Sequence, residues 1–395
     1  MRKSSIRRSL SLLLLGFLVA AGTAASAAET TIPVILPLTG NASFLGQGIQ
    51  RVLKVLEAVV NKDGGIGGSE LRFEFQDDQT SPQVAVQLTN ALVASHPTVM
   101  MGSGLVAMCN AMAPLVRNGP VDYCLSPAAQ PMPGSFMYST NASTRDLIMA
   151  DFRYFKSRGW TRVATISSSD ATGQDFEKGV DAAMGAPENR GIEIVASPRF
   201  NQSDVSVAAQ LERIKAANPQ VLVAWTTGAP IATIFKGVIQ ADLSIPVVTT
   251  NGNQTFEQMQ QYAAFLPKEL YFASSLFEPH DGVLSLDPQI EAAQKSFYAA
   301  MAEAKAPVDI VAAHAWDPAM MLVAALRQMG PGATALQIKQ FLDDLSGYAG
   351  VNGIYDFKKS PQRGLDIQST VVTRWDAADR HWTMVSKPGG EALLK

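Results

Sequence analysis

Short apolar segments alternate with longer segments of helical periodicity along most of the chain. Residues 32–36 form the first apolar segment, and residues 47–62 repeat apolar side chains at helical spacing. Residues 71–76 alternate apolar and polar side chains, which is typical of a strand with one buried face. Alternating strands and helices are the signature of βαβ units around a mainly parallel sheet. The pattern predicts an α/β fold, with further strands at residues 99–101, 121–125, 163–167, 192–197, 221–225, 247–250 and 270–273.

The pattern changes late in the chain. Three consecutive helices are expected at residues 288–303, 308–329 and 335–345, after which strands return at residues 353–357 and 367–375. This return predicts two doubly wound lobes between which the chain crosses more than once. We expect crossings near residues 138–141, 273–276 and 350–352. Lobe 1 then comprises residues 28–139 and 275–349, and lobe 2 comprises residues 140–274 and 350–395.

The N-terminus has the composition of a secretory signal peptide. Basic residues at positions 2, 3, 7 and 8 precede an apolar run over residues 10–21 and an Ala-Ser-Ala sequence ending at Ala27. The apolar run is shorter than the roughly 20 residues that span a bilayer. We expect cleavage near Ala27 and a soluble periplasmic product, since no cysteine near that position could carry a lipid.

Charge excludes some classes of partner. Removing four basic residues with the signal peptide takes the formal net charge from −3 to −7. An acidic chain without a basic cluster is a poor match for nucleic acid or an anionic membrane. With 395 residues, 47% of them hydrophobic, the chain has the length of about two domains.

Cys109 and Cys124 are the two cysteines of the chain. In an oxidising compartment, a disulfide between them is favoured. Two buried free thiols are the alternative.

Small and hydroxylic residues collect where the predicted strands end. Ligands of open α/β sheets bind beyond the carboxyl ends of the strands. There, backbone N–H groups and helix N-termini bind a carboxylate without a basic side chain. Helix caps and turns explain any one such loop equally well, but six on one edge favour a binding cleft. The six loops are residues 37–46, 102–105, 126–130, 167–173, 226–228 and 251–254.

Catalytic motifs are missing from the sequence. The chain has no G-x-S-x-G and no G-x-x-x-x-G-K-[ST] motif. Asp77 and Asp78 are interpreted as a solvated strand end rather than as paired catalytic carboxylates. We expect no catalytic residue, no metal and no cofactor; an enzyme whose residues meet only in space is the alternative of a different class. The histidines without metal-ligand spacing are His96, His280, His314 and His381.

An ordered series of segments resembles the leucine/isoleucine/valine-type periplasmic binding proteins of ABC importers. The segments are residues 36–40, 61–68, 77–78, 113–115, 125–129, 170–176 and 316–326. The resemblance implies a type I binding-protein fold with three crossings and hinge closure around a small molecule. It also implies a monomer that delivers its ligand to an ABC permease in the inner membrane. An extracytoplasmic sensor that presents the same closed state to a membrane receptor is the alternative.

The resemblance also implies where a ligand binds. The loops at Gly104–Leu105 and Ala128–Gln130 hold a carboxylate, and Ser43–Leu45 packs on the ligand. An acidic residue at about Asn251 binds an α-ammonium in relatives, and a tyrosine is common at about Thr172. The full set of expected ligand-binding residues is Ser43, Phe44, Leu45, Ser103, Gly104, Leu105, Ser126, Ala128, Ala129, Gln130, Thr172, Thr227, Asn251 and His314.

The sequence departs from that pattern at the ammonium site. Asn251 lacks the negative charge that a buried ammonium needs, and Leu105 replaces a hydroxyl residue. Aromatic or aliphatic carboxylates are therefore the leading ligand class, ahead of branched-chain-type amino acids. Phe44, Trp225 and Trp316 are available to stack on an aromatic ligand, although the core is the favoured place for Trp225. For His314, pocket and structural roles are equally favoured.

Overall fold

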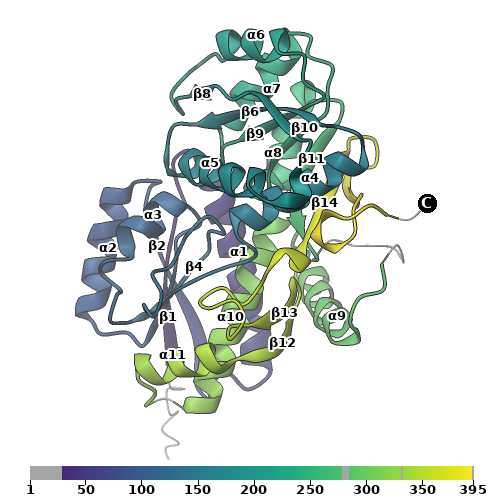
Figure 1. Ribbon diagram of the computed structural model, residues 1–395. Coiled ribbons are helices and arrows are strands. Elements are labelled where there is room, and N and C mark those ends of the chain that lie inside the picture. The colour runs from purple at the N-terminus through teal and green to yellow at the C-terminus, as the bar shows by residue number, and fades with distance from the viewer. Residues whose placement is uncertain (1–28, 278–283, 331, 394–395) are drawn as a thin grey trace, which may run out of the picture.

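The computed structural model describes residues 29–277, 284–330 and 332–393. The described chain forms two lobes, each a β-sheet flanked by helices, and the C-terminal part of the chain runs along both (Figure 1). The predicted α/β class is therefore confirmed.

The first lobe contains a five-stranded parallel sheet in the order β2-β1-β3-β4-β5. Helices α1, α9, α10 and α11 cover one face, and α2 and α3 cover the other. The strands are β1 (Glu29–Leu36), β2 (Glu70–Asp77), β3 (Val99–Gly102), β4 (Val121–Cys124) and β5 (Met137–Ser139). The helices are α1 (Ser43–Lys62), α2 (Pro82–Ala94), α3 (Val106–Met112), α9 (Pro288–Glu303), α10 (Ile310–Met329) and α11 (Ala335–Asp344).

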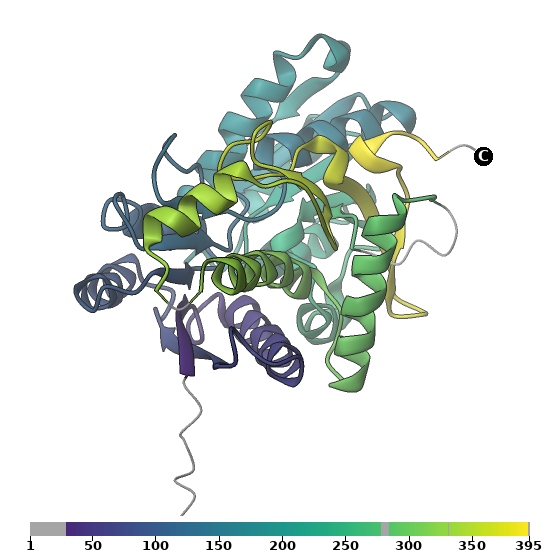
Figure 2. The same cartoon turned by 90° about the horizontal axis from the view of Figure 1, so that it is seen from below.

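Local sequence explains where these helices lie. In α1, the apolar stripe that includes Ile49, Val52, Leu53 and Leu56 is buried against the sheet and α10. Helix α10 runs beside α1, as seen from below in Figure 2. Helix α2 begins where the Ser81 side chain accepts the Val84 N–H and proline occupies the first turn.

The second lobe contains a larger sheet in the order β15-β14-β11-β10-β9-β6-β7, with β8 beside β6. Strands β14 and β15 run antiparallel to their neighbours, and the remaining pairs are parallel. The strands are β6 (Arg162–Ser168), β7 (Glu193–Ala196), β8 (Arg199–Phe200), β9 (Val221–Trp225), β10 (Val247–Thr250), β11 (Leu270–Ser275), β14 (Thr370–Asp376) and β15 (His381–Met384). The helices are α4 (Thr144–Ser157), α5 (Ala171–Met184), α6 (Ala208–Ala216), α7 (Ile231–Gln240) and α8 (Phe256–Gln261).

Short 3-10 turns complete the described chain, namely η1 (Pro187–Asn189), η2 (Asn251–Asn253), η3 (Ala263–Phe265), η4 (Ile367–Ser369) and η5 (Pro388–Gly390). The strand predicted at residues 367–375 thus begins as η4 and becomes β14 only at Thr370. The helix predicted to begin at residue 47 begins at Ser43, and the short strands β5, β8, β12 and β15 were not predicted.

Helix α10 anchors the segments between the lobes. Because Pro318 has no N–H, the carbonyl of His314, four residues earlier, loses its helical partner and accepts the Thr140 hydroxyl at 2.9 Å. Asp317 accepts the Val351 N–H at 2.8 Å and the Asn352 N–H at 3.1 Å. The rigid helix therefore fixes two of the predicted crossing regions, near residues 138–141 and 350–352.

The hairpin of β12 (Ser346–Gly350) and β13 (Gly353–Asp356) follows α11. After it, Tyr355, Phe357 and Leu365 remain in the hydrophobic core of the first lobe. The third crossing thus leads into a segment that packs on the first lobe before β14 joins the second sheet. The lobe boundaries remain a prediction.

Cys109 on α3 and Cys124 on β4 form a disulfide, with 6.0 Å between their Cα atoms. It ties the helix that follows β3 to the neighbouring strand. Within the described ranges, no helix combines the length and apolar character needed to cross a bilayer.

Candidate functional site

The carboxyl ends of the strands of both sheets meet at a cleft between the lobes. Residues from the β3–α3 loop, the loop after β4 and the N-terminal half of α10 form its first wall. Residues from the ends of β9 and β10 and from the starts of α4 and α5 form its second wall. The lining residues are Leu45, Gly104, Leu105, Val106, Ser126, Pro127, Ala128, Thr144, Leu147, Thr172, Trp225, Thr227, Thr250, Asn251, Gly252 and His314.

The lobes lie in close contact around this cleft. The cavity measures about 30 Å³, which is room for roughly one or two water molecules. The Ala229 N–H donates to the Asn41 carbonyl across the cleft at 3.0 Å. Arg51 of α1 also forms an ion pair with Glu257 of α8. The cleft in this arrangement of the lobes is therefore too small to hold a solute of amino-acid size.

A buried carboxyl group lies next to that ion pair. Asp309, which caps the start of α10, accepts the Phe256 N–H of the second lobe at 3.4 Å. Burial, reinforced by the charge of Glu257, raises the pKa of Asp309 to about 7. The contact between the lobes thus contains a group that titrates near neutral pH.

Asn251 lies at the second wall in the 3-10 turn after β10 and is 1% exposed. Its Oδ1 accepts the Thr250 hydroxyl at 3.3 Å, while its Nδ2 has no hydrogen-bond partner among the described residues. Asn253 holds this corner in place, because its side chain accepts the Gly228 N–H at 3.0 Å and donates to the Thr226 carbonyl at 2.7 Å. A hydrogen-bonded turn therefore holds a cleft-lining residue whose side-chain N–H group has no partner among the described residues.

His314 contributes a second unpaired polar atom to the cleft lining. Its Nε2 has no partner among the described residues, and burial lowers its pKa to about 3. The imidazole is therefore neutral at physiological pH. No Asp, Glu, Lys or Arg is among the described lining residues, so amides, hydroxyls, the neutral imidazole of His314 and apolar side chains make up the lining that the structure describes.

Asp77 positions the first loop of the cleft. Its carboxylate accepts the Leu38 N–H at 2.9 Å, the Thr39 N–H at 3.1 Å and the Thr39 hydroxyl at 2.7 Å. Although burial acts to raise the pKa of Asp77, these bonds and one from Gln79 lower it. The interpretation of this acidic pair as a solvated strand end is therefore wrong for Asp78, which is 0% exposed, whereas Asp77 is the partly exposed last residue of β2 and also anchors the loop.

Ser103 does not line the cleft. Its hydroxyl donates to Asp78 Oδ2 at 2.6 Å in the interior of the first lobe. Desolvation raises the pKa of Asp78 despite this bond. Ser103 therefore supports the Gly104–Leu105 loop from behind.

Four other expected residues also lie outside the lining, and two of them contact the opposite lobe. The ring of Phe44 meets Tyr262 edge-on at 6.4 Å, and Gln130 Nε2 lies 3.5 Å from Asp175 Oδ1. Ser43 is the first residue of α1, and the carbonyl of Ala129 accepts from Arg363.

Trp225 both lines the cleft and belongs to the core. It is 2% exposed and stacks on Phe176 with 4.8 Å between ring centroids. Trp316, by contrast, lies in the first-lobe core against Phe297. Thr144 and Leu147 at the start of α4 were not predicted, because that helix follows a predicted crossing region and the short strand β5, which has no periodicity.

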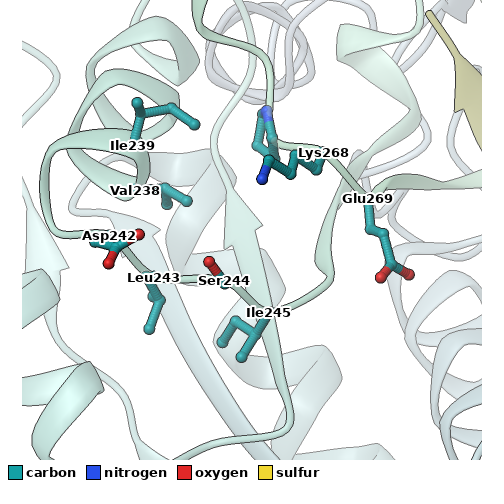
Figure 3. A pocket seen from close by; sticks show the side chains of 9 residues that line it. Val238, Ile239, Asp242, Leu243, Ser244, Ile245, Lys268 and Glu269 are labelled. Carbon is teal, nitrogen blue, oxygen red and sulfur yellow. The ribbon is translucent and has the colours of Figure 1, made fainter.

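A larger hollow, about 280 Å³, lies elsewhere on the second lobe (Figure 3). Its lining includes Ile239, Ile245, Lys268 and Glu269, the last of which directly precedes β11. The hollow therefore opens at the amino ends of β10 and β11, on the opposite edge of the sheet from the cleft. Within the described part of the chain, which does not include His280, no cluster of three or more His, Cys, Asp or Glu residues is arranged to hold a metal ion.

Comparison with known proteins identifies the family. A family model described as periplasmic binding protein matches residues 29–380. The Leu/Ile/Val-binding protein homolog 3 of Brucella melitensis biotype 1 is 25% identical over 204 residues, which are 50% of this chain and 54% of that relative. The alignment thus spans about half the length of this curated relative.

Solved structures share the fold at low sequence identity. An extracellular ligand-binding receptor from Rhodopseudomonas palustris HaA2 has a TM-score of 0.78 at 20% identity, covering 91% of this chain and 100% of that one. The branched-chain amino acid transporter substrate binding protein LivJ from Streptococcus pneumoniae, solved with isoleucine, has a TM-score of 0.74 at 17% identity, covering 91% and 99%. A fatty acid ABC transporter substrate-binding protein from Thermomonospora curvata has a TM-score of 0.75 at 14% identity, covering 93% and 95%.

These matches confirm the type I binding-protein fold and the resemblance to the leucine/isoleucine/valine type. Since the family model matches residues 29–380, the chain belongs to the periplasmic binding protein family.

Proposed function

We propose that this protein is the exported solute-binding component of an ABC importer, which captures a small carboxylate between its lobes and delivers it to a membrane permease. The proposal includes cleavage of a signal peptide near Ala27, within residues that lie outside the described part of the chain. The family supports a substrate-binding role, and two of the structural neighbours are themselves described as transporter substrate-binding proteins.

The uncharged lining of the cleft is the observation that supports a carboxylate without an amino group as the ligand. An α-ammonium buried there would find no carboxylate among the described lining residues, and an unpaired buried charge is strongly unfavourable. Asn251 offers Nδ2, which is a donor and suits an acceptor on the ligand. Aromatic and aliphatic acids without an amino group fit this arrangement better than α-amino acids do.

Calorimetry and thermal-shift measurements test the ligand class. The probes are leucine, its keto acid 4-methyl-2-oxopentanoate, benzoate and 3-phenylpropenoate. We expect at least one acid without an amino group to bind, and to stabilise the fold by about 2.7 kcal/mol at 100 times its dissociation constant. Binding of leucine alone would contradict the proposal, and would point to a carboxylate such as Glu278, which lies outside the described residues.

Asn251→Asp provides the matched variant. The added carboxylate should weaken binding of the acids and strengthen binding of leucine, each by about tenfold or more, which corresponds to about 1.4 kcal/mol. Asn201→Asp adds the same charge at an exposed position of the second lobe and should leave both affinities unchanged. Equal effects of the two variants would mean that Asn251 does not face the ligand.

A further inference from the structure

Arg363 places a buried guanidinium group behind the cleft loop that follows β4. The side chain comes from the segment after β13, and the residue is 8% exposed. Its Nη1 donates to the carbonyls of Pro127 at 3.0 Å, Asn141 at 3.0 Å and Thr140 at 3.3 Å. Its Nη2 donates to the carbonyl of Ala129 at 2.7 Å. One side chain thus joins the cleft loop to the first crossing.

The positive charge of Arg363 has no carboxylate partner in direct contact. Among the described residues it forms no salt bridge, and Asp146 and Asp175 of the second lobe act on it only at longer range. Burial lowers the pKa of Arg363 to about 10, so the group remains charged at neutral pH. Keeping such a charge in the interior is unfavourable unless something compensates it.

The carbonyl bonds fix the direction of the neighbouring amides. In a trans peptide the C=O and the following N–H point in opposite directions. Because the Pro127 carbonyl points at Arg363, the Ala128 N–H points away from it, and Ala128 lines the cleft. No acceptor for this N–H is found among the described residues. The guanidinium also polarises the peptide group that it contacts, which strengthens the amide as a donor.

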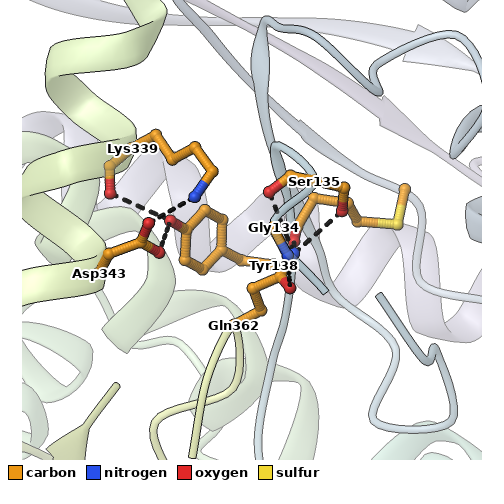
Figure 4. A network of polar contacts seen from close by, with 7 residues as sticks. Gly134, Ser135, Tyr138, Lys339, Asp343 and Gln362 are labelled. Carbon is orange, nitrogen blue, oxygen red and sulfur yellow. Dashed lines mark hydrogen bonds and ion pairs between the residues drawn. The ribbon is translucent and has the colours of Figure 1, made fainter. Parts of the chain in front are cut away.

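Gln362 holds the same segment in place. Its Oε1 accepts the Gly134 N–H at 3.0 Å, and its Nε2 donates to the carbonyls of Ser135 at 3.1 Å and Met137 at 2.6 Å (Figure 4). Tyr138 in turn donates to Asp343 of α11 at 2.6 Å. Gln362 has φ of +60°, an uncommon conformation for a residue other than glycine. These contacts keep Arg363 against the loop.

We infer that Arg363 is a positioning residue for an anionic ligand: it aims the Ala128 amide into the cleft and supplies, through that peptide, the positive charge that the lining lacks. This inference rests on the proposed binding of a carboxylate. The proposed role of Arg363 would explain how the cleft can bind an anion although no basic side chain is among its described lining residues.

The test separates charge from geometry. Arg363→Met removes both the positive charge and the hydrogen bonds to the four backbone carbonyls. Arg363→Lys keeps the charge, but an ammonium group cannot reproduce the planar geometry with which the guanidinium donates to these carbonyls. Arg327→Met is the matched control, since Arg327 also donates to backbone carbonyls, those of Gly65 and Val60 at the far end of α1. That end is about 30 Å from the cleft end of the helix.

Calorimetry with benzoate and benzamide, and with 3-phenylpropenoate and its amide, measures the preference for an acid over its neutral analogue. We expect Arg363→Met to reduce this ratio at least tenfold, Arg363→Lys to retain part of it, and Arg327→Met to leave it unchanged. An unchanged ratio in Arg363→Met would show that the charge of Arg363 plays no part in ligand choice.

Amide hydrogen exchange over residues 126–130 tests the geometry without a ligand. Exchange there should become at least tenfold faster in Arg363→Met and in Arg363→Lys, and remain unchanged in Arg327→Met. Wild-type exchange rates in both Arg363 variants would overturn the positioning role. If the wild-type protein binds none of the three acids without an amino group, the proposed ligand class fails, while the exchange measurement still decides whether Arg363 orders the loop. Should Arg363→Met fail to fold, the lysine variant carries both readouts.

Discussion

Asp122 is a carboxyl group enclosed in the first lobe without a hydrogen-bond partner among the described residues. It lies on β4, and its neighbours Val121 and Tyr123 face the core on the other side of the sheet. Its side chain therefore points to the face covered by α2 and α3. Burial raises the pKa of Asp122 well above 3.8.

This raised pKa gives the stability of the protein a definite pH dependence. Above about pH 3.8 the unfolded chain loses the Asp122 proton, whereas the folded chain retains it up to the raised pKa. Stability attributable to this group is therefore greatest in acid and falls as the pH rises between those two values. Asp122→Asn removes this dependence. We expect the variant to be more stable than wild type by about 1–3 kcal/mol at pH 7, with a smaller difference near pH 4.

Urea unfolding of both proteins at the two pH values measures the effect. Asp379→Asn, at an exposed position of the second lobe, should leave the free energy of unfolding unchanged at both pH values. A stabilisation of equal size at pH 4 and pH 7 would show that the Asp122 proton is not involved.

At the level of single residues, the sequence indicated the cleft but not the direction of each side chain. Thr172, Thr227 and Asn251 could be predicted because each follows a strand end, where an α/β sheet places its ligand. Ser103 follows a strand end as well, yet its hydroxyl turns inward to Asp78. Arg363 could not be predicted, because it lies in a polar turn far along the chain and approaches the cleft only through tertiary packing.

The disulfide belongs to the scale of elements, since it joins α3 to the neighbouring strand β4. A cross-link over a separation of 15 residues is expected to stabilise the fold by about 3 kcal/mol. The double variant Cys109→Ser/Cys124→Ser should therefore unfold at lower urea concentration than wild type.

Intact mass after denaturation and alkylation tests the bond directly. Without reductant, the secreted protein should gain no alkyl group, and after reduction it should gain two. Two alkyl groups added without reductant would show free thiols and refute the pairing.

Elements with a clear sequence pattern were predictable, and strands of two or three residues were not. The predicted bounds of β9, β10 and α9 agree with those observed, because β9 and β10 are continuous β-branched or apolar runs and α9 is an amphipathic helix that begins at a proline. Strand β5 has three residues and β8 has two. Segments this short carry no periodicity, and they are strands only because a neighbouring strand pairs with them.

For the whole molecule, the α/β class and the two-lobed plan followed from the alternation of elements and from the family resemblance. The packing of residues 351–365 on the first lobe could not be predicted from either. Tyr355, Phe357 and Leu365 are apolar and suit either core, and only the contacts with α10 and α11 place them. Asp317 is a further example. It accepts the N–H groups of Val351 and Asn352 at the third crossing region, but nothing in the sequence distinguishes it from any other aspartate in a helix.

We expect the two lobes to close on a ligand that both contact. Asn251 lies on the lobe opposite the loop at residues 126–130, and the cleft enclosed by both is too small to admit a solute without opening. Binding should therefore shift an equilibrium between open and closed forms. Asn251→Ala should weaken binding of the acid probe by about tenfold, or about 1.4 kcal/mol, whereas Asn201→Ala should not.

Small-angle X-ray scattering with and without saturating 3-phenylpropenoate, or whichever of the three acids without an amino group binds, tests closure most directly. We expect a smaller radius of gyration with ligand than without it. The Asn251→Ala variant should need a higher probe concentration than wild type to reach that smaller radius. An unchanged radius at saturation, together with unimpaired binding by Asn251→Ala, would show that one lobe alone holds the ligand and would contradict closure.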